Sequence, residues 1–453
     1  MPAIDQQELD PLTCERLSRR FRHTRVVMDG EVMRRELERL LFEGTGVRVD
    51  ACARPKAELS DATCWLQYPL HVRTSTNQSG DVLVLGTMFT GSGLAARFER
   101  AALAPLAARW HPSSDPSPRP TGTVDSLDLA VSVFPINNTL PTLVDATNPD
   151  CVSAVFRARM SDWHGGAITG IDLVHLRRTR GCVLRYRLQA PRQRVVYGKV
   201  GYGAPSKIIH DAVDVLAGQD GAIRFPHEVF HSNELDLSVV DEVPGSRPDL
   251  RSETAVEEAV DAAARIAASL HTSGVTVPRM HTFDDEIARA RSALEEVRRY
   301  APRLAAWLTT IVDAVEITAT RWPATAMVLA HGDFTPSQLL LDGPTVGIVD
   351  FDKLCQAEPA FDLGRFVAYL RFALKKHGNR RGDAMVSRFL NAYEAFGGPA
   401  ASSARVDLYE ATSLIRMAAR SWLQLKPARL SVVASVLEKR AEPMQVRGAT
   451  RPL

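Results

Sequence analysis

Apolar and polar residues alternate along two neighbouring stretches near the middle of the chain, 180–188 and 194–200. Alternation with a period of two predicts two β-strands, and the short polar stretch between them predicts a turn. The stretch 205–216 changes to apolar residues at three- and four-residue spacing, which predicts a helix. A third strand is expected over 235–243, because Pro244 and Gly245 end the pattern there.

From residue 253 onward the helical pattern dominates. The stretches 254–270 and 284–310 place apolar residues on one face and charged residues on the others, as helices packed on a core do. Further helical runs cover 360–397 and 406–424. Two short apolar stretches, each beside an acidic turn, interrupt the series. The chain therefore predicts a small antiparallel sheet followed by a large α-rich part.

The first 150 residues show a faint repeat of the pattern in 178–244. The paired stretches are 64–70 with 182–188, 81–87 with 194–199, 94–110 with the helix after 199, and 127–135 with 235–244. We hypothesise a degenerate copy in which Thr87 stands where Lys199 stands. Such a copy would act as a cap over a cleft or as an interface, and could serve as a homodimer surface. The alternative is that any two α+β segments of this length share this order of elements.

The composition excludes several classes of protein. Of the 453 residues, 24% are charged and the formal net charge is +2, so no dominant field for nucleic acid or membranes is expected. No apolar stretch reaches the roughly 18 residues of a membrane helix, and no signal sequence is visible. The six cysteines include no Cys-x-x-Cys pair. These features predict reduced thiols and a cytoplasmic protein.

The two acidic turns carry the candidate chemistry. Asp333 follows His331 and Gly332, and Gln338 lies five residues further on. Asp350 forms the second turn, twelve residues after Gln338. A carboxylate can accept the proton of a hydroxyl that is being phosphorylated, and carboxylate and amide oxygens suit Mg²⁺.

Asp352 lies two residues beyond Asp350, on the same face of an extended strand. Its carboxylate could reach a second metal ion or the loop that carries Asp333. It could equally be a solvated acid of the turn, and the spacing does not distinguish these alternatives.

This pattern resembles the aminoglycoside phosphotransferase and choline kinase-like families, relatives of the protein kinases. Their catalytic loop reads His-Gly-Asp-x-x-x-x-Asn, and a strand that ends in Asp follows it. His331, Gly332, Asp333 and Asp350 match. Gln338 replaces the Asn and has the same amide oxygen on a stem one methylene longer. The resemblance continues through 358–366, where it implies that Asp362 is buried and accepts hydrogen bonds from the catalytic loop.

The resemblance implies an α+β, protein kinase-like bilobal fold with an extra N-terminal α+β segment. The small antiparallel-sheet lobe would cover nucleotide with residues 151–245, and the large α-rich lobe would span 246–453. Residues 1–150 form the extra segment.

The resemblance also implies roles for single residues. Lys199 would hold the α- and β-phosphates of ATP, oriented by Asp211 or Asp214 in the next helix. The stretch 240–243 would be the hinge whose backbone binds the adenine, which gives Val240, Glu242 and Val243 as nucleotide-binding residues. Asp333 would be catalytic, and Asp350 with Gln338 would hold Mg²⁺. Asp352, from its place on the strand, is a further candidate ligand. His331 would brace the loop.

The activity implied is ATP-dependent phosphorylation of a small-molecule hydroxyl acceptor of aminoglycoside, sugar or amino-alcohol type, with GTP as the alternative phosphoryl donor. A polycationic aminoglycoside needs an acidic cleft, and the helix around Asp407 and Glu410 offers some acidity. The alternatives are a nucleotide-binding pseudokinase with a regulatory or interaction role, and a scaffold that binds no nucleotide.

Overall fold

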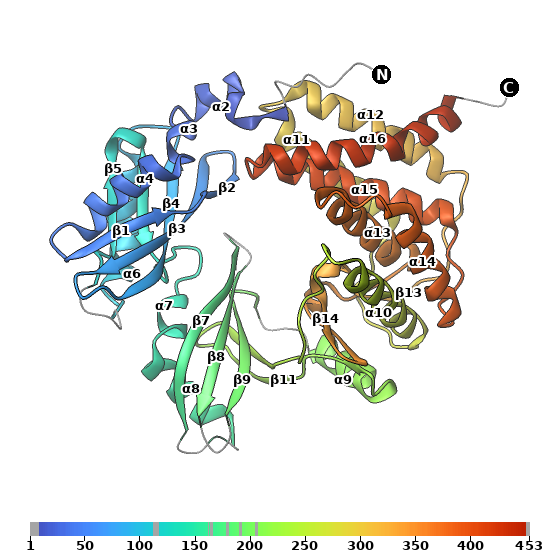
Figure 1. Ribbon diagram of the computed structural model, residues 1–453, viewed down its shortest axis with the longest axis horizontal. Helices are drawn as coiled ribbons and strands as arrows, with labels where there is room; N and C mark the ends of the chain where they lie inside the picture. The colour runs from blue at the N-terminus through green and yellow to red at the C-terminus, as the bar shows by residue number, and fades with distance from the viewer. Residues whose placement is uncertain are drawn as a thin grey trace.

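The computed structural model describes residues 9–111, 117–161, 163, 166–177, 181–189, 193–203 and 207–449, with side chains up to residue 440. Figure 1 shows an N-terminal sheet, a second sheet and a large helical part that follow one another around a common centre. None of the helices in these ranges is both long and apolar enough to cross a membrane.

The N-terminal segment is a six-stranded antiparallel sheet flanked by short helices. Its strands pair in the order β1-β3-β4-β6-β5, and β2 pairs with the free length of β3. The elements are α2 (Glu15–Arg20), α3 (Thr24–Val27), α4 (Gly30–Leu37), β1 (Val47–Cys52), β2 (Lys56–Leu59), β3 (Thr63–Thr74), β4 (Ser79–Phe89), α5 (Leu94–Phe98), α6 (Ala104–Ala107), β5 (Thr121–Val124), β6 (Leu129–Val133) and α7 (Leu143–Ala146).

The second sheet contains the strands predicted in the middle of the chain. Its five antiparallel strands pair in the order β7-β8-β9-β12-β11. They are β7 (Ala167–Arg177), β8 (Gly181–Gln189), β9 (Arg194–Val200), β11 (Glu228–Ser232) and β12 (Leu237–Asp241), preceded by α8 (Pro149–Arg159). The predicted helix is α9 (Lys207–Gln219), and positions 205 and 206 of that prediction lie outside the described residues.

The two faces of this sheet have different surroundings. Tyr186 and Val196 are fully buried on one face, and the Tyr186 ring contacts Phe156 of α8 at a centroid distance of 5.3 Å. Because side chains alternate along a strand, Val195 and Lys199 lie on the other face. Burial of one face therefore leaves the Lys199 face for a ligand.

The large part is helical with two small sheets embedded in it. Its helices are α10 (Glu253–Thr272), α11 (Phe283–Arg298), α12 (Pro302–Ala319), α13 (Pro359–Lys376), α14 (Gly382–Ala395), α15 (Ser403–Leu423) and α16 (Pro427–Ala449). Its strands are β10 (Ile223–Arg224), β13 (Val328–Ala330), β14 (Leu339–Asp342), β15 (Thr345–Ile348) and β16 (Cys355–Ala357). The single run expected over 284–310 is wrong, because it is divided between α11 and α12. Pro302 starts α12, and proline lacks the amide hydrogen that a continuous helix would need there.

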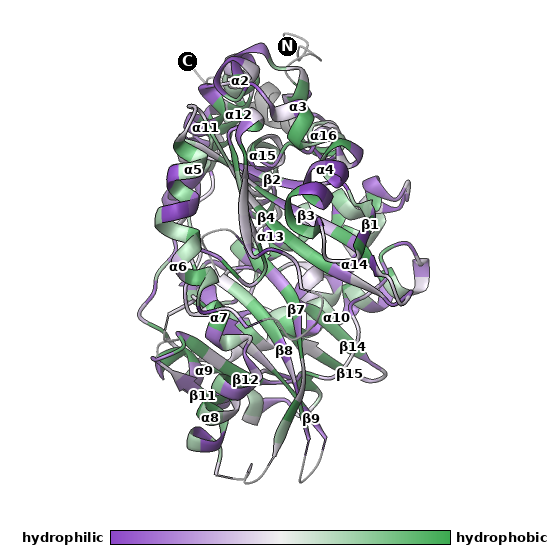
Figure 2. Ribbon diagram, turned by 90° about the vertical axis from the view of Figure 1, so that its left-hand side faces the viewer, coloured by the Kyte–Doolittle hydropathy of each residue, from purple (hydrophilic) through white to green (hydrophobic). Residues whose placement is uncertain are grey.

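The distribution of apolar residues agrees with this arrangement. Figure 2 shows hydrophobic residues along the central strands of both sheets and hydrophilic residues on peripheral helices such as α2 and α4. The predicted α+β, protein kinase-like bilobal fold, with a small antiparallel-sheet lobe, a large α-rich lobe and an extra N-terminal α+β segment, is confirmed.

The two sheets share strand order and register. The order β3-β4-β6-β5 corresponds to β8-β9-β12-β11. Gly86 pairs with Leu66 and Val131, as Gly198 pairs with Leu184 and Val239. A buried tyrosine ring covers each glycine, Tyr68 over the first and Tyr186 over the second. The residue before β6 and the residue before β12 are both aspartates with positive φ, +50° and +45°.

Candidate active site

The loop after β13 is braced by its histidine. The backbone amide of Asp333 donates to His331 Nδ1 at 3.2 Å, so the ring proton resides on Nε2, which lies 3.1 Å from the Val349 carbonyl oxygen and donates to it. His331 is fully buried. It therefore fixes the loop to the start of the second acidic turn, which is the structural role expected for it.

Asp362 holds the same loop through hydrogen bonds to its backbone. Its carboxylate, which has no exposed surface, accepts hydrogen bonds from the amides of His331 at 2.6 Å and Gly332 at 3.1 Å. The prediction of a buried acceptor at Asp362 is confirmed. Gly332 has φ +79°, and a Cβ there would lie 2.1 Å from the Lys353 carbonyl oxygen. Two backbones meet at this point, so only glycine fits.

Asp333 lies in a strongly positive environment. The residue is 8% exposed, and its carboxylate accepts a hydrogen bond from Lys353 Nζ at 2.8 Å and forms an ion pair with Arg365. Burial alone would raise the pKa of Asp333, but Arg365 and Lys353 outweigh it and hold the pKa well below its ordinary value. Asp333 is therefore ionised at neutral pH.

Sequence reasoning missed these two cations. Lys353 directly follows Asp352, and Arg365 falls within the stretch 358–366 that carries the resemblance. Their position was visible, but nothing in a linear pattern indicates that both side chains turn toward Asp333.

The second acidic turn meets Lys199 of β9. Lys199 Nζ lies 2.6 Å from Asp352 Oδ1 and 3.3 Å from Asp350 Oδ1, and Gln338 Nε2 donates to Asp350 Oδ2 at 3.2 Å. The structure thus brings together Lys199 and all three candidate metal ligands. Asp352 is half-buried and bonded to Lys199, so it is not a solvated acid of the turn.

The expected acidic partner of Lys199 in α9 is wrong for both candidates. Asp211 pairs with Lys207 at 2.7 Å, and Asp214 pairs with His227 at 2.9 Å. The cause is the packing of α9, whose buried residues Ala212, Val213 and Leu216 join the core of the large part. The helix therefore docks away from β9, and Asp350 and Asp352 take the place of its acids.

A cavity of about 880 Å³ lies beside the predicted hinge. Glu242 and Val243 line it, together with Val195 of β9 and Phe225, whereas Val240 does not. Val240 pairs with Tyr197 inside the sheet. Val195 and Lys199 are four residues apart on one face of β9, which corresponds to roughly 13 Å along a strand. The volume is within the usual range for a small-molecule site.

The donor set at the second turn fits magnesium. It consists of two carboxylates and a side-chain amide, with the Lys199 ammonium as a cation bonded to both acids. Across the described residues no group of three or more His, Cys, Asp or Glu side chains could hold a metal ion. Mg²⁺ commonly takes only one or two protein carboxylates and completes its coordination with water and phosphate oxygens. A site completed by a bound nucleotide matches these residues.

The chain matches a known protein family over part of its length. Residues 207–405 match the model of a phosphotransferase enzyme family. No curated protein matches the chain. Solved structures with a similar fold include a choline/ethanolamine kinase family protein from Mesorhizobium loti, with 16% identity over 65% of this chain and 98% of that one and a TM-score of 0.47.

Two further solved structures are similar. A choline kinase from Cryptosporidium parvum is 12% identical, covers 66% of this chain and 97% of its own, and has a TM-score of 0.49. A putative aminoglycoside phosphotransferase from Ralstonia eutropha is 15% identical over 67% of this chain and 98% of its own, with a TM-score of 0.46. The family match contains Asp333, Gln338, Asp350 and Asp352. The match of residues 207–405 to the phosphotransferase enzyme family model confirms the resemblance inferred from the catalytic-loop residues.

Proposed function

We propose that this phosphotransferase transfers the γ-phosphoryl group of ATP to a hydroxyl of a small molecule. The observation that carries the proposal is the contact of Lys199 with Asp350 and Asp352, next to the loop that presents Asp333. One cation and two oxygen ligands converge there from two lobes. Phosphoryl transfer depends mainly on positioning and charge neutralisation, which this arrangement supplies.

The nucleotide would extend from the 880 Å³ cavity to Lys199. Backbone groups at Glu242 and Val243 would bind the adenine, and Lys199 would pair with the α- and β-phosphates. Asp350, Asp352 and Gln338 would hold Mg²⁺, which neutralises phosphate charge when bound. A rotation of the Gln338 amide exchanges Nε2 for Oε1 as the atom beside Asp350, so the longer side chain retains a ligand oxygen.

Asp333 would orient the acceptor hydroxyl. In the transfer, the acceptor oxygen forms a bond to the γ-phosphorus, the bond to the bridging oxygen breaks, and ADP leaves with that oxygen. The hydroxyl proton passes to Asp333. A carboxylate with a strongly lowered pKa is a weak base, so the proton moves late, after the bond to phosphorus has begun to form. Lys353 lies beside the same carboxylate and would stabilise negative charge on the reacting oxygens.

Magnesium-dependent binding of ATP tests this proposal. With ATP at about one hundred times its dissociation constant, binding stabilises the folded state by about 2.7 kcal/mol, which raises Tm by several degrees. We expect this shift to require Mg²⁺ and to disappear in Asp350→Ala. Asp342→Ala, an exposed acid in the β14–β15 turn, is the matched control and keeps the shift.

The outcomes separate the alternatives. A shift accompanied by ADP formation with an acceptor supports the kinase, whereas a magnesium-dependent shift without transfer to any acceptor supports a pseudokinase. A shift that survives Asp350→Ala, or no shift at all, contradicts the proposed site.

We further propose that residues 1–150 are a degenerate copy of the nucleotide-covering lobe, with 151–245 as that lobe and 246–453 as the catalytic lobe. Shared strand order and register support this. Thr87 pairs with Trp65 and Ala130, and Lys199 pairs with Val183 and Ser238, so the two residues occupy corresponding positions.

The copy has no room for a nucleotide. Leu103, which precedes α6, packs against Ala130 of β6 and covers the Thr87 face. The cavity left there is about 10 Å³, which is no more than one water molecule needs. In the second sheet α9 packs on the large part instead, and the corresponding face stays open. The N-terminal segment would therefore act as a cap and not as a second nucleotide site.

Paired substitutions at the two corresponding positions test this assignment. Lys199→Met removes charged hydrogen bonds to phosphate and is expected to weaken MgATP binding by about tenfold to a hundredfold. Thr87→Val, which keeps side-chain shape, should leave binding unchanged. Isothermal titration calorimetry with MgATP measures the affinity of both variants. An equal loss of affinity in Thr87→Val would contradict an N-terminal copy that binds no nucleotide.

A further inference from the structure

The acidic residues that could attract a polycationic acceptor are paired with arginines of the same protein. Asp407 forms an ion pair with Arg440, and the buried carboxylate of Glu410 lies 2.9 Å from Arg371 and 3.1 Å from Arg440. These are the acids of α15 that the sequence offered for an aminoglycoside. Two arginines compensate them inside the large part, so neither acid is available to attract a cation.

Cationic and aromatic side chains form a row that begins next to Asp333 and follows α13. Arg365, which pairs with Asp333, stacks its guanidinium 5.7 Å from the Tyr369 ring centroid. Phe372, on the same helix, contacts the guanidinium of Arg429 at 5.2 Å. Residues 365, 369 and 372 lie on one face of α13, and seven residues of helix span roughly 10 Å. Arg429 thus lies at the end of this row that is remote from the catalytic carboxylate.

Arg429 lacks an anionic partner. Its Nε is buried without a hydrogen-bond partner, and in the described ranges no carboxylate forms an ion pair with its side chain. It lies in the first turn of α16, which contains no acidic residue. Backbone amides at a helix start add to the positive potential. Burying a guanidinium without a counter-charge lowers the stability of the folded protein, and a bound anion would remove that free-energy cost.

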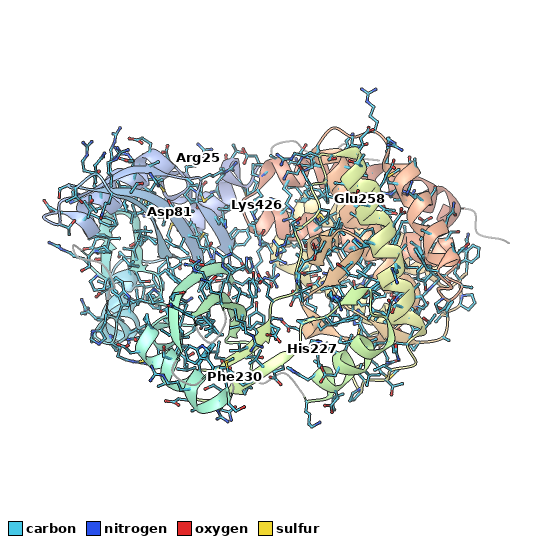
Figure 3. The ribbon with its side chains drawn as sticks, turned by 60° about the horizontal axis from the view of Figure 1, so that its bottom comes forward. Arg25, Asp81, His227, Phe230, Glu258 and Lys426 are labelled. Carbon is cyan, nitrogen blue, oxygen red and sulfur yellow. The ribbon has the colours of Figure 1, made fainter. Side chains whose placement is uncertain are left out.

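Lys426 adds a second cation at the same place. Its ammonium donates to Gln424 Oε1 at 2.9 Å and has no acidic partner within the described chain. Burial, followed by the charges of Arg429, Arg420 and Lys56, lowers the pKa of Lys426 to about 8, and Glu58 acts weakly in the other direction. Figure 3 shows Lys426 at the boundary between the N-terminal segment and the helical part.

Basic residues also surround His175 of the second sheet. His175 of β7 has a lowered pKa, first because of burial and then because of Arg177, Lys56 and Arg247, whereas Asp350 acts in the opposite direction. Lys56 of β2 therefore acts on both His175 and Lys426, which belong to different lobes.

We propose that the acceptor is an anionic small molecule whose carboxylate or phosphate group binds Lys426 and Arg429 while its hydroxyl lies at Asp333. This inference rests on the proposed kinase function, because it assigns the acceptor of that reaction. The anion supplies the charge that Arg429 lacks, and the spacing along α13 separates the anionic group from the reacting hydroxyl. The basic surroundings disfavour aminoglycosides and cationic amino alcohols.

Binding of inorganic phosphate and of acetate to the protein without nucleotide tests the site directly. We expect Arg429→Gln to weaken binding at least tenfold. Arg388→Gln, which changes an arginine paired with Asp261 on the α10–α14 surface, should leave binding unchanged. Lys199→Met should retain the binding that depends on Arg429, since Lys199 belongs to the nucleotide site. Tighter binding of phosphate points to a phosphate ester as acceptor, and tighter binding of acetate to a carboxylate.

Two results would overturn the proposal. One is unchanged phosphate and acetate binding in Arg429→Gln, and the other is loss in Lys199→Met with retention in Arg429→Gln, which would assign the anion to the nucleotide site. If Arg429→Gln does not fold, Lys426→Gln takes its place. Wild-type binding should also weaken above pH 8 as Lys426 loses its proton, and Lys426→Gln should abolish that dependence.

The MgATP-dependent shift in Tm of Arg429→Gln separates this inference from the proposed function. A retained shift with lost anion binding supports both proposals. Absence of any nucleotide shift in wild type refutes the kinase function, and anion binding at Arg429 is then read independently from the phosphate titration.

Discussion

Replacing Asp333 with Asn is expected to lower kcat by about two to four orders of magnitude while MgATP binding stays close to that of the wild type. Asn can accept a hydrogen bond but cannot take the hydroxyl proton at the end of the transfer. The nucleotide contacts at Lys199 and Asp350 do not involve Asp333, so ground-state affinity is retained. Single-turnover rates and nucleotide titrations measure the two effects separately.

The choice of Asn over Ala follows from the surroundings. Asp333 neutralises Arg365, which is almost completely buried, and Lys353. Removing one partner of a buried ion pair costs about 3–5 kcal/mol, because a charge is left without compensation. Asn retains an acceptor for one of the two donors. Urea unfolding of Asp333→Asn, with the exposed Asp342→Asn as control, determines how much lost activity reflects lost folded protein.

The pH dependence of the wild type adds a second check on Asp333. Because the pKa of Asp333 in the folded protein is far below its ordinary value, its carboxylate stays ionised well below pH 5. No acid limb from this residue should therefore appear in kcat/KM between pH 5 and 8. A variant Asp333→Asn that keeps wild-type turnover, or a wild-type acid limb that this substitution removes, would contradict the assignment.

The sequence predicted what depends on local pattern and spacing. The strands β8 and β9 follow from alternation, and the braced loop at His331 and Asp362 follows from a resemblance to enzymes with the same spacing. Asp350 and Gln338 are brought together because β14 and β15 form a short hairpin between them. In each case the contact is fixed by residues close together in the chain or by a shared motif.

Contacts that depend on docking were not predictable. The acids of α9 carry the expected spacing, yet the apolar face of that helix packs on the large part and takes them away from Lys199. The same limit applies to Glu410. In the sequence it is one acid on a helix, whereas in the structure its buried carboxylate forms ion pairs with Arg371 and Arg440. Periodicity indicates that a helix buries one face, but not which neighbour it is buried against.

The N-terminal repeat illustrates both cases. Paired hydrophobic stretches indicated corresponding strands, and Thr87 lies opposite residues equivalent to those opposite Lys199. The covering of the Thr87 face by Leu103 depends on how the following helices dock, and no sequence spacing encoded it.

Replacing Gly332 with Ala is expected to disable the active site through the backbone. Gly332 has φ +79°, and an added Cβ would lie 2.1 Å from the carbonyl oxygen of Lys353, so either the loop or the second acidic turn must move. That movement would pull the Gly332 amide from Asp362 and Lys353 from Asp333. We expect turnover to fall at least a hundredfold, since displacements of about 1 Å have effects of that size.

Gly343→Ala provides a matched control for this substitution. Gly343 also has positive φ, +57°, but no heavy atom lies within 4 Å of the position of its Cβ. It therefore bears the conformational penalty of about 1–2 kcal/mol without the collision. Urea unfolding and turnover of both variants isolate the contact with Lys353. Equal losses of stability and activity in the two would mean that backbone conformation alone requires Gly332, whereas a much larger loss in Gly332→Ala means that the close approach of the two acidic turns itself holds the site together.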